Sequence, residues 1–277
     1  MSLTELWKNA PTQFEDKHLQ QIIAFTGDGK LRDHAPTANE FRTFLAQIPS
    51  ELLERYIVEC LNDNFPDSGL ALQDLVNQLG HRLGFRVENG LYRGRRNAIG
   101  FDGLWHFPNG HGVVVEIKTT DTYRIDTDVV AGYRKQLINA GRLEEERSSI
   151  LFVVGRQDTG DLEAQIRGSK HAWDVRLIGV QALLNLLRLK ESVDDPQLVD
   201  RICSILIPRE FTRLDEIVFF ATEEAKQEAP VLEEADDPEP SIIGSDSTHP
   251  ATPATPPSAF HGACIEPPTS PSIPASG

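Results

Sequence analysis

Four segments of the chain place a carboxylate two residues before a lysine. They are Glu15–Lys17, Asp28–Lys30, Glu116–Lys118 and Glu224–Lys226. Only Glu116-Ile117-Lys118 ends an apolar run, VVVEIK, that is typical of a buried strand. Because side chains alternate along a strand, Glu116 and Lys118 should emerge on one face. Burying charged groups without partners is unfavourable, so the pair is a candidate for chemistry, although a buried structural ion-pair cluster remains the alternative.

A second carboxylate, Asp102, lies 14 residues before Glu116 in the preceding predicted strand. A hairpin turned at PNGHG (108–112) would bring Asp102 beside Glu116. Two carboxylates and a backbone carbonyl suit Mg²⁺, with Mn²⁺ as an alternative. A lysine at the same place can hold the attacking water and offset charge that builds on phosphorus. The chemistry that this set favours is phosphodiester hydrolysis.

Periodicity predicts the elements that position these residues. Apolar residues of 68–84 recur at helical spacing, and Gly84 should end that helix. Strands are expected at 85–92, 99–107, 113–120, 148–155 and 175–180. A helix is expected at 126–140, with Asp126 or Thr127 as its cap, and its predicted inner residues are Val129, Val130, Tyr133 and Leu137. The predicted order is αβββαβ, followed by αβ and further helices, which is an α/β fold with a mixed central sheet.

This order, with Asp102 on the second strand and Glu116-x-Lys118 on the third, resembles the PD-(D/E)xK, or restriction-endonuclease-like, nucleases. The resemblance covers roughly residues 68–185. Within that superfamily the layout is similar to Mrr-like restriction endonucleases, through LQDLV before LGFRVENG, the strand ILFVV and the closing VRLIGVQALLNLL. It implies that Asp102, Glu116 and the carbonyl oxygen of Ile117 bind the metal and that Lys118 serves the water.

The chain departs from that family pattern at two places. Phe101 stands where the family name has proline. Mrr-like helices often carry a glutamate where this chain has Gln73, so a third ligand could come from Gln73, from the adjacent Asp74 or from Glu54.

Further candidates flank the predicted site. Gln136 lies in the helix after the third strand, where related nucleases often place a glutamine near the metal, but a solvated surface glutamine fits equally well. Arg93, Arg95 and Arg96, in the turn between the first two strands, could bind phosphates or simply form a solvated hairpin tip. Trp105 is expected to be a core residue rather than a stacking platform for bases.

Composition divides the chain into four regions. Residues 222–277 hold ten acidic residues, one lysine and 11 of the 18 prolines, which predicts a disordered acidic tail that either solubilises the chain or docks another protein. The tail carries −9 of the net charge of −15, so the remaining body, at −6, argues against a broad basic DNA-binding face. The other regions are a helical N-terminal extension (1–67), in which Ser50 is the expected cap of a helix at 50–61, the nuclease-like core (68–190) and a helical annex (191–221).

The chain shows no apolar run long enough for a bilayer, no secretory signal and no paired-cysteine motif, so a soluble cytoplasmic protein without membrane contact is expected.

The sequence as a whole predicts a Mg²⁺-dependent endonuclease in restriction, phage defence or DNA processing, with DNA favoured over RNA. Cleavage of both strands would call for a homodimer or a partner subunit. The alternative is a non-catalytic nuclease-fold adaptor, or nucleic-acid-binding subunit, that recruits a partner through its tail.

Overall fold

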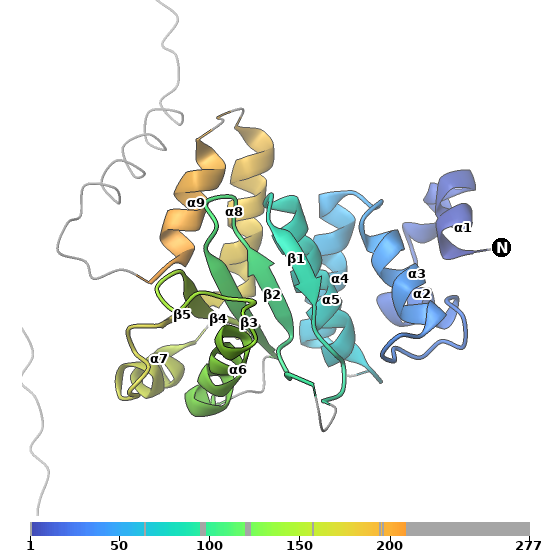
Figure 1. Cartoon of the computed structure of the whole chain (residues 1–277). Helices are drawn as coiled ribbons and strands as arrows, with labels where there is room; N and C mark the ends of the chain where they lie inside the picture. The colour runs from blue at the N-terminus through green and yellow to red at the C-terminus, as the bar shows by residue number, and fades with distance from the viewer. Residues whose placement is uncertain are drawn as a thin grey trace, which may run out of the picture. The chain divides into compact units, whose positions relative to one another are not determined.

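A computed structural model describes residues 2–63, 65–94, 98–119, 123–156, 158–193, 195 and 197–208. These residues form an α/β fold in which helices cover both faces of a five-stranded mixed sheet (Figure 1). The predicted tail (222–277) and residues 209–221 of the predicted annex (191–221) lie outside the described residues. Within the described part, no helix combines the length and apolarity needed to cross a membrane.

The sheet follows the chain order β1-β2-β3-β4-β5. Its strands are β1 (Arg86–Asn89), β2 (Gly103–His106), β3 (Gly112–Lys118), β4 (Ser148–Val154) and β5 (Val175–Gly179). β1, β2 and β3 pair antiparallel, whereas β3, β4 and β5 pair parallel. Each parallel connection contains a helix, because the chain must cross back over the sheet before it can add a parallel strand. The predicted αβββαβ order and mixed sheet are confirmed, although β1 and β2 are shorter than expected.

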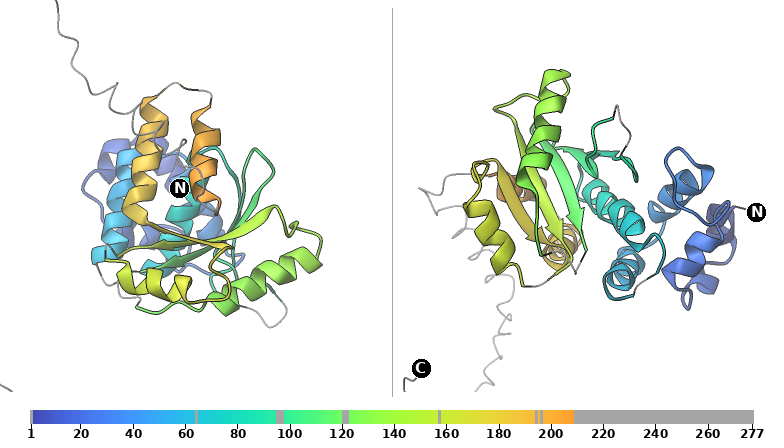
Figure 2. Two further views of the ribbon diagram at one scale, coloured as in Figure 1. Left: turned by 90° about the vertical axis from the view of Figure 1, so that its left-hand side faces the viewer. Right: turned by 90° about the horizontal axis from the view of Figure 1, so that it is seen from below.

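Helices lie on both faces of this sheet (Figure 2). They are α5 (Ser68–Arg82) and α8 (Val180–Ser192) on one face, and α6 (Thr127–Asn139) and α7 (Gly160–Arg167) on the other. A further helix, α9 (Leu198–Leu206), packs against α8. Gly84 follows α5 with φ +96°, a conformation that glycine adopts without strain, and so ends the helix as predicted.

The region before the sheet is helical, as predicted. Its elements are α1 (Leu3–Asn9), the 3₁₀ turn η1 (Pro11–Phe14), α2 (Leu19–Ala24), α3 (Pro36–Leu45) and α4 (Ser50–Asn62). Both α3 and α4 pack against α5, so this region shares its packing with the core. Ser50 was expected to cap α4, but Pro49 occupies the cap position. The Ser50 hydroxyl instead donates to Glu191 at the end of α8, 2.6 Å away.

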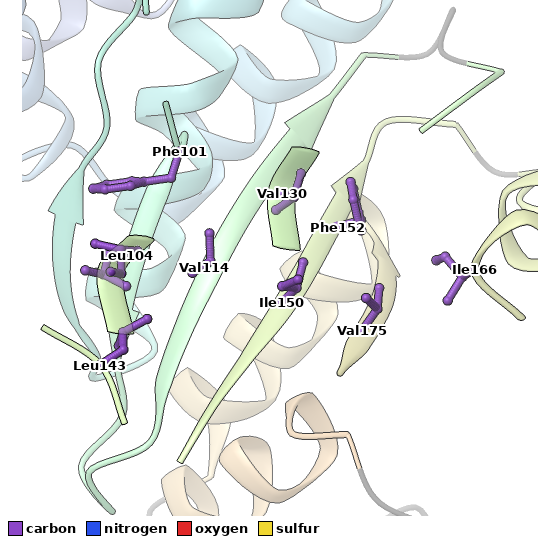
Figure 3. Close-up of a cluster of buried hydrophobic side chains, with 10 residues drawn as sticks. Phe101, Leu104, Val114, Val130, Leu143, Ile150, Phe152, Ile166 and Val175 are labelled. Atoms are coloured by element: carbon purple, nitrogen blue, oxygen red, sulfur yellow. The ribbon is translucent and has the colours of Figure 1, made fainter. Parts of the chain in front are cut away.

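The α6/α7 face of the sheet holds a cluster of buried apolar side chains (Figure 3). Its members from the strands include Leu104, Val114, Ile150, Phe152 and Val175. From α6, Val130 and Leu137 complete the cluster as predicted, whereas Val129 is 45% exposed and does not belong to the inner stripe. Because side chains alternate, Trp105 points to the opposite face, where it is fully buried as expected.

His111, in the turn between β2 and β3, is expected to make stability depend on pH. Its Nε2 lies 2.9 Å from Ser149 Oγ, and burial, helped by Arg134 and Arg147, lowers its pKa to about 4. An unfolded histidine titrates near 6.5, so between pH 6.5 and 4 the unfolded chain binds the extra proton and this contribution to stability is lost as pH falls.

We expect the stability difference between wild type and His111→Gln to shrink from pH 7 to pH 5, measured as urea midpoints. The difference between the two proteins is the informative quantity. Burial raises the pKa of Asp74 and of Asp102, so these carboxyls add stability as pH falls, opposite in sign to His111. A difference that is constant across this range would contradict the assignment.

Candidate active site

Strand pairing brings Asp102 and Glu116 to one end of the sheet. Gly103 pairs with Val115, and the Asp102 amide donates to the Val115 carbonyl at 3.2 Å, so Asp102 immediately precedes β2 opposite Glu116. The hairpin predicted from PNGHG is therefore present. The Ile117 amide donates to Asp102 Oδ2 at 2.8 Å, which fixes the carboxylate against β3.

Glu116 and Lys118 share the strand face predicted by alternation. Lys118 Nζ lies 2.6 Å from Glu116 Oε1, and the two side chains are 31% and 13% exposed. The other carboxylate oxygen, Glu116 Oε2, is buried and has no hydrogen-bond partner among the described residues. A buried charged oxygen without a partner is unfavourable in a purely structural ion pair. Its lone pairs are available to a ligand that a structural cluster would not need.

Burial raises the pKa of Asp102, and the neighbouring charge of Glu116 raises it further. The Ile117 amide and the Lys118 ammonium act in the opposite direction, since both favour the ionised carboxylate. Two carboxylates held this close repel each other unless a cation lies between or beside them. A carboxyl pKa that is shifted by burial and by a defined charged neighbour is typical of functional sites.

Helix α5 holds the backbone of Asp102 in place. The Asp102 carbonyl oxygen accepts from Gln73 Nε2 at 2.9 Å, from Asn77 Nδ2 at 3.0 Å and from the Gly90 amide at 2.9 Å. At Gly90 only glycine fits, because a Cβ would lie 1.8 Å from the Phe101 carbonyl oxygen. Asn77 was not predicted as a site residue, although two polar residues four positions apart on the inner stripe of a helix were a usable signal.

Neither alternative third carboxylate reaches this set. Asp74 is fully buried and bound elsewhere: Arg42 Nε donates to its Oδ1 at 2.8 Å, and the Tyr92 hydroxyl donates to its Oδ2. Glu54 forms an ion pair with Arg188 on α8. Gln73 donates its amide nitrogen to the Asp102 carbonyl oxygen, so the prediction that Gln73 could be a third ligand is not supported by this contact.

On α6, Tyr133 lies near the two carboxylates. Gly100, two residues before Asp102, lies against the Tyr133 ring, since a Cβ there would be 3.1 Å from the hydroxyl oxygen. Burial raises the pKa of Tyr133, followed by the charges of Glu116 and Asp102. Gln136 is exposed and lies nearly one turn farther along α6. Tyr133 was predicted only as an inner apolar residue. Its polar hydroxyl group, on an otherwise apolar helix face, could have indicated a position near the candidate site.

Of the three predicted phosphate-binding arginines, the structure describes Arg93. Its side chain is exposed, and its amide donates to Asp33 Oδ2 at 3.3 Å. Arg95 and Arg96 lie outside the described residues.

The donor set fits a hard divalent cation with few protein ligands. Among the described residues, no three His, Cys, Asp or Glu side chains come together as a metal-binding group. Mg²⁺ does not require such a cage, because it is commonly held by one or two carboxylates while water and substrate phosphates complete its octahedron. Asp102, Glu116 with its unpartnered Oε2, and the Ile117 carbonyl would be the ligands offered by this chain.

Comparison with known proteins adds no family to this description: no protein-family model matches the chain, and no curated protein is significantly similar to it.

Proposed function

We propose that this chain is a Mg²⁺-dependent nuclease of the PD-(D/E)xK type that hydrolyses phosphodiester bonds. The observation that carries the proposal is the convergence of Asp102, Glu116 and Lys118 where β2 begins and β3 ends, with one buried Glu116 oxygen lacking a hydrogen-bond partner among the described residues. The αβββαβ order of the elements supports it. We favour DNA over RNA as the substrate and Mn²⁺ as a substitute metal.

Each member of the set has a distinct role in the proposed reaction. Asp102 and Glu116 hold the cation, and the Ile117 amide keeps the Asp102 carboxylate in its orientation. A bound Mg²⁺ would supply Lewis-acid stabilisation of charge on the phosphate and lower the pKa of an attacking water. Lys118, tethered to Glu116, orients the water by hydrogen bonding and offsets negative charge as it develops on phosphorus.

The direct test measures cleavage of supercoiled plasmid, linear duplex, single-stranded DNA and RNA with Mg²⁺, Mn²⁺ or EDTA. We expect cleavage with either metal and none with EDTA. Lys118→Met should lower the rate by roughly 10²–10³-fold, the usual loss when one donor to developing charge is removed. Lys135→Met is the matched control, because Lys135 is an exposed lysine on α6 and should be dispensable.

Two results would contradict the proposal. One is the absence of metal-dependent cleavage on all four substrates, which would favour the non-catalytic adaptor. The other is equal loss of activity in Lys118→Met and Lys135→Met, since a general loss of positive charge would then explain the effect.

A further inference from the structure

A cavity of about 420 Å³ lies between the N-terminal helices and the connection from β1 to β2. Three segments far apart in sequence line it: residues of α2 and the loop that follows it, the turn before α5, and Arg93. Its charged lining residues are Lys30, Arg32, Asp67 and Arg93. Positive side chains therefore outnumber negative ones in its wall.

The acidic groups around this cavity are occupied by other partners. Asp67 Oδ2 accepts from the Leu31 amide at 3.3 Å, and Asp28 pairs with Arg32 at 2.9 Å. Asp33 accepts from the amides of Tyr92 and Arg93 at 2.7 and 3.3 Å. The Lys30 amide also donates to Asp28 Oδ1 at 3.2 Å, so backbone amides engage all three carboxylates.

The positively charged side chains that line the cavity have fewer partners than the carboxylates around it. Within the described residues, no carboxylate forms an ion pair with the side chain of Lys30 or of Arg93, and both side chains are exposed. The cavity therefore offers two unpaired cations, and Arg32 adds a third that is already shared with Asp28. An anion with several oxygens, such as a phosphate group, matches this arrangement.

The cavity is connected to the candidate active site through one short segment. Arg93 lies on the β1–β2 connection, which begins at Gly90, whose amide donates to the Asp102 carbonyl. The same connection is anchored to α5 by the Tyr92 hydroxyl, which donates to Asp74. A nucleic-acid strand bound at the cavity would therefore contact the β1–β2 connection, the same segment that continues to Asp102.

We propose that this cavity binds backbone phosphates of the nucleic-acid strand that the candidate active site cleaves, so the N-terminal helices form part of the substrate-binding surface. The proposal rests on the nuclease function proposed above for its substrate. It also explains how a body with net negative charge can bind nucleic acid, because a few local cations replace a broad basic face.

The test measures binding of a fluorescently labelled DNA oligonucleotide to the full chain in EDTA, by anisotropy across a KCl series. Each phosphate contact contributes about 0.7–0.9 to the slope of log K against log salt. Lys30→Ala and Arg93→Ala should each reduce the slope by about that amount, and the double variant by about twice as much. Lys8→Ala, which removes an exposed lysine of α1 outside the cavity, should leave the slope unchanged.

The outcomes separate this proposal from the nuclease proposal. Cleavage with unchanged salt slopes in both cavity variants would overturn the cavity and leave the nuclease standing. Binding that depends on Lys30 and Arg93, without metal-dependent cleavage, would support the cavity and count against the nuclease. Thermal stabilisation by inorganic phosphate that needs Lys30 and Arg93, without oligonucleotide binding, would mark a small-anion site and overturn the proposal.

Discussion

Asp102→Asn should greatly slow metal-dependent cleavage and, without metal, make the protein more stable. The asparagine oxygen can still accept from the Ile117 amide, so the local structure should persist. What disappears is a charge that burial and Glu116 both disfavour. We expect the cleavage rate to fall by roughly 10³-fold, because in the proposed site this carboxylate would hold a cation that contributes several kcal/mol to stabilising the transition state. We expect the free energy of unfolding to rise by about 1 kcal/mol, because residues kept for function often lower the stability of the fold.

Single-turnover cleavage, urea unfolding and melting with and without Mg²⁺ measure these effects. Mg²⁺ should raise the melting temperature of the wild type but not of Asp102→Asn, since a ligand that binds only the native state stabilises it. Asp126→Asn is the matched control: it removes a carboxylate that caps α6, and asparagine caps equally well. Destabilisation of Asp102→Asn with retained cleavage would instead identify the cluster as a structural ion pair.

Asp74→Ala should cause the largest loss of stability, about 3–5 kcal/mol, because it leaves the Arg42 guanidinium without its partner in a partly buried place. The Tyr92 hydroxyl loses its acceptor in the same change. Burial raises the pKa of Asp74 to about 6, so the measurement belongs at pH 8, where the carboxylate is ionised. Urea unfolding gives the free energy.

A second variant distinguishes loss of this network from general damage to the core. Replacing all three members, as in Asp74→Leu with Arg42→Met and Tyr92→Phe, removes the unpaired polar groups along with the charge. It should recover much of the lost stability, since apolar residues of similar volume can replace a buried ion pair. A triple variant no more stable than Asp74→Ala would show that packing rather than ion pairing sets the loss. Because Tyr92 precedes Arg93, Asp74→Ala should also weaken oligonucleotide binding at the cavity.

Local patterns were sufficient for the order of the core elements and for the position of the candidate residues. Helical and strand periodicities differ over a few residues, so α5, the three antiparallel strands and the apolar β4 could be predicted without any long-range contact. Strand alternation and one hairpin were then enough to bring Asp102 near Glu116 and Lys118. The functional roles of these residues stay predictions.

Only the tertiary structure decided which polar groups meet across the fold. Asp74 stands beside Gln73 in the sequence, yet it is bound by Arg42 and Tyr92, and the cavity joins segments around residues 30, 67 and 93. Such partners depend on how helices dock, and no local period encodes that. The same reason explains why Tyr133, assigned by its spacing to the apolar stripe, lies beside Gly100 and in the field of the carboxylates. Periodicity says which way a side chain faces, whereas packing decides what it meets there.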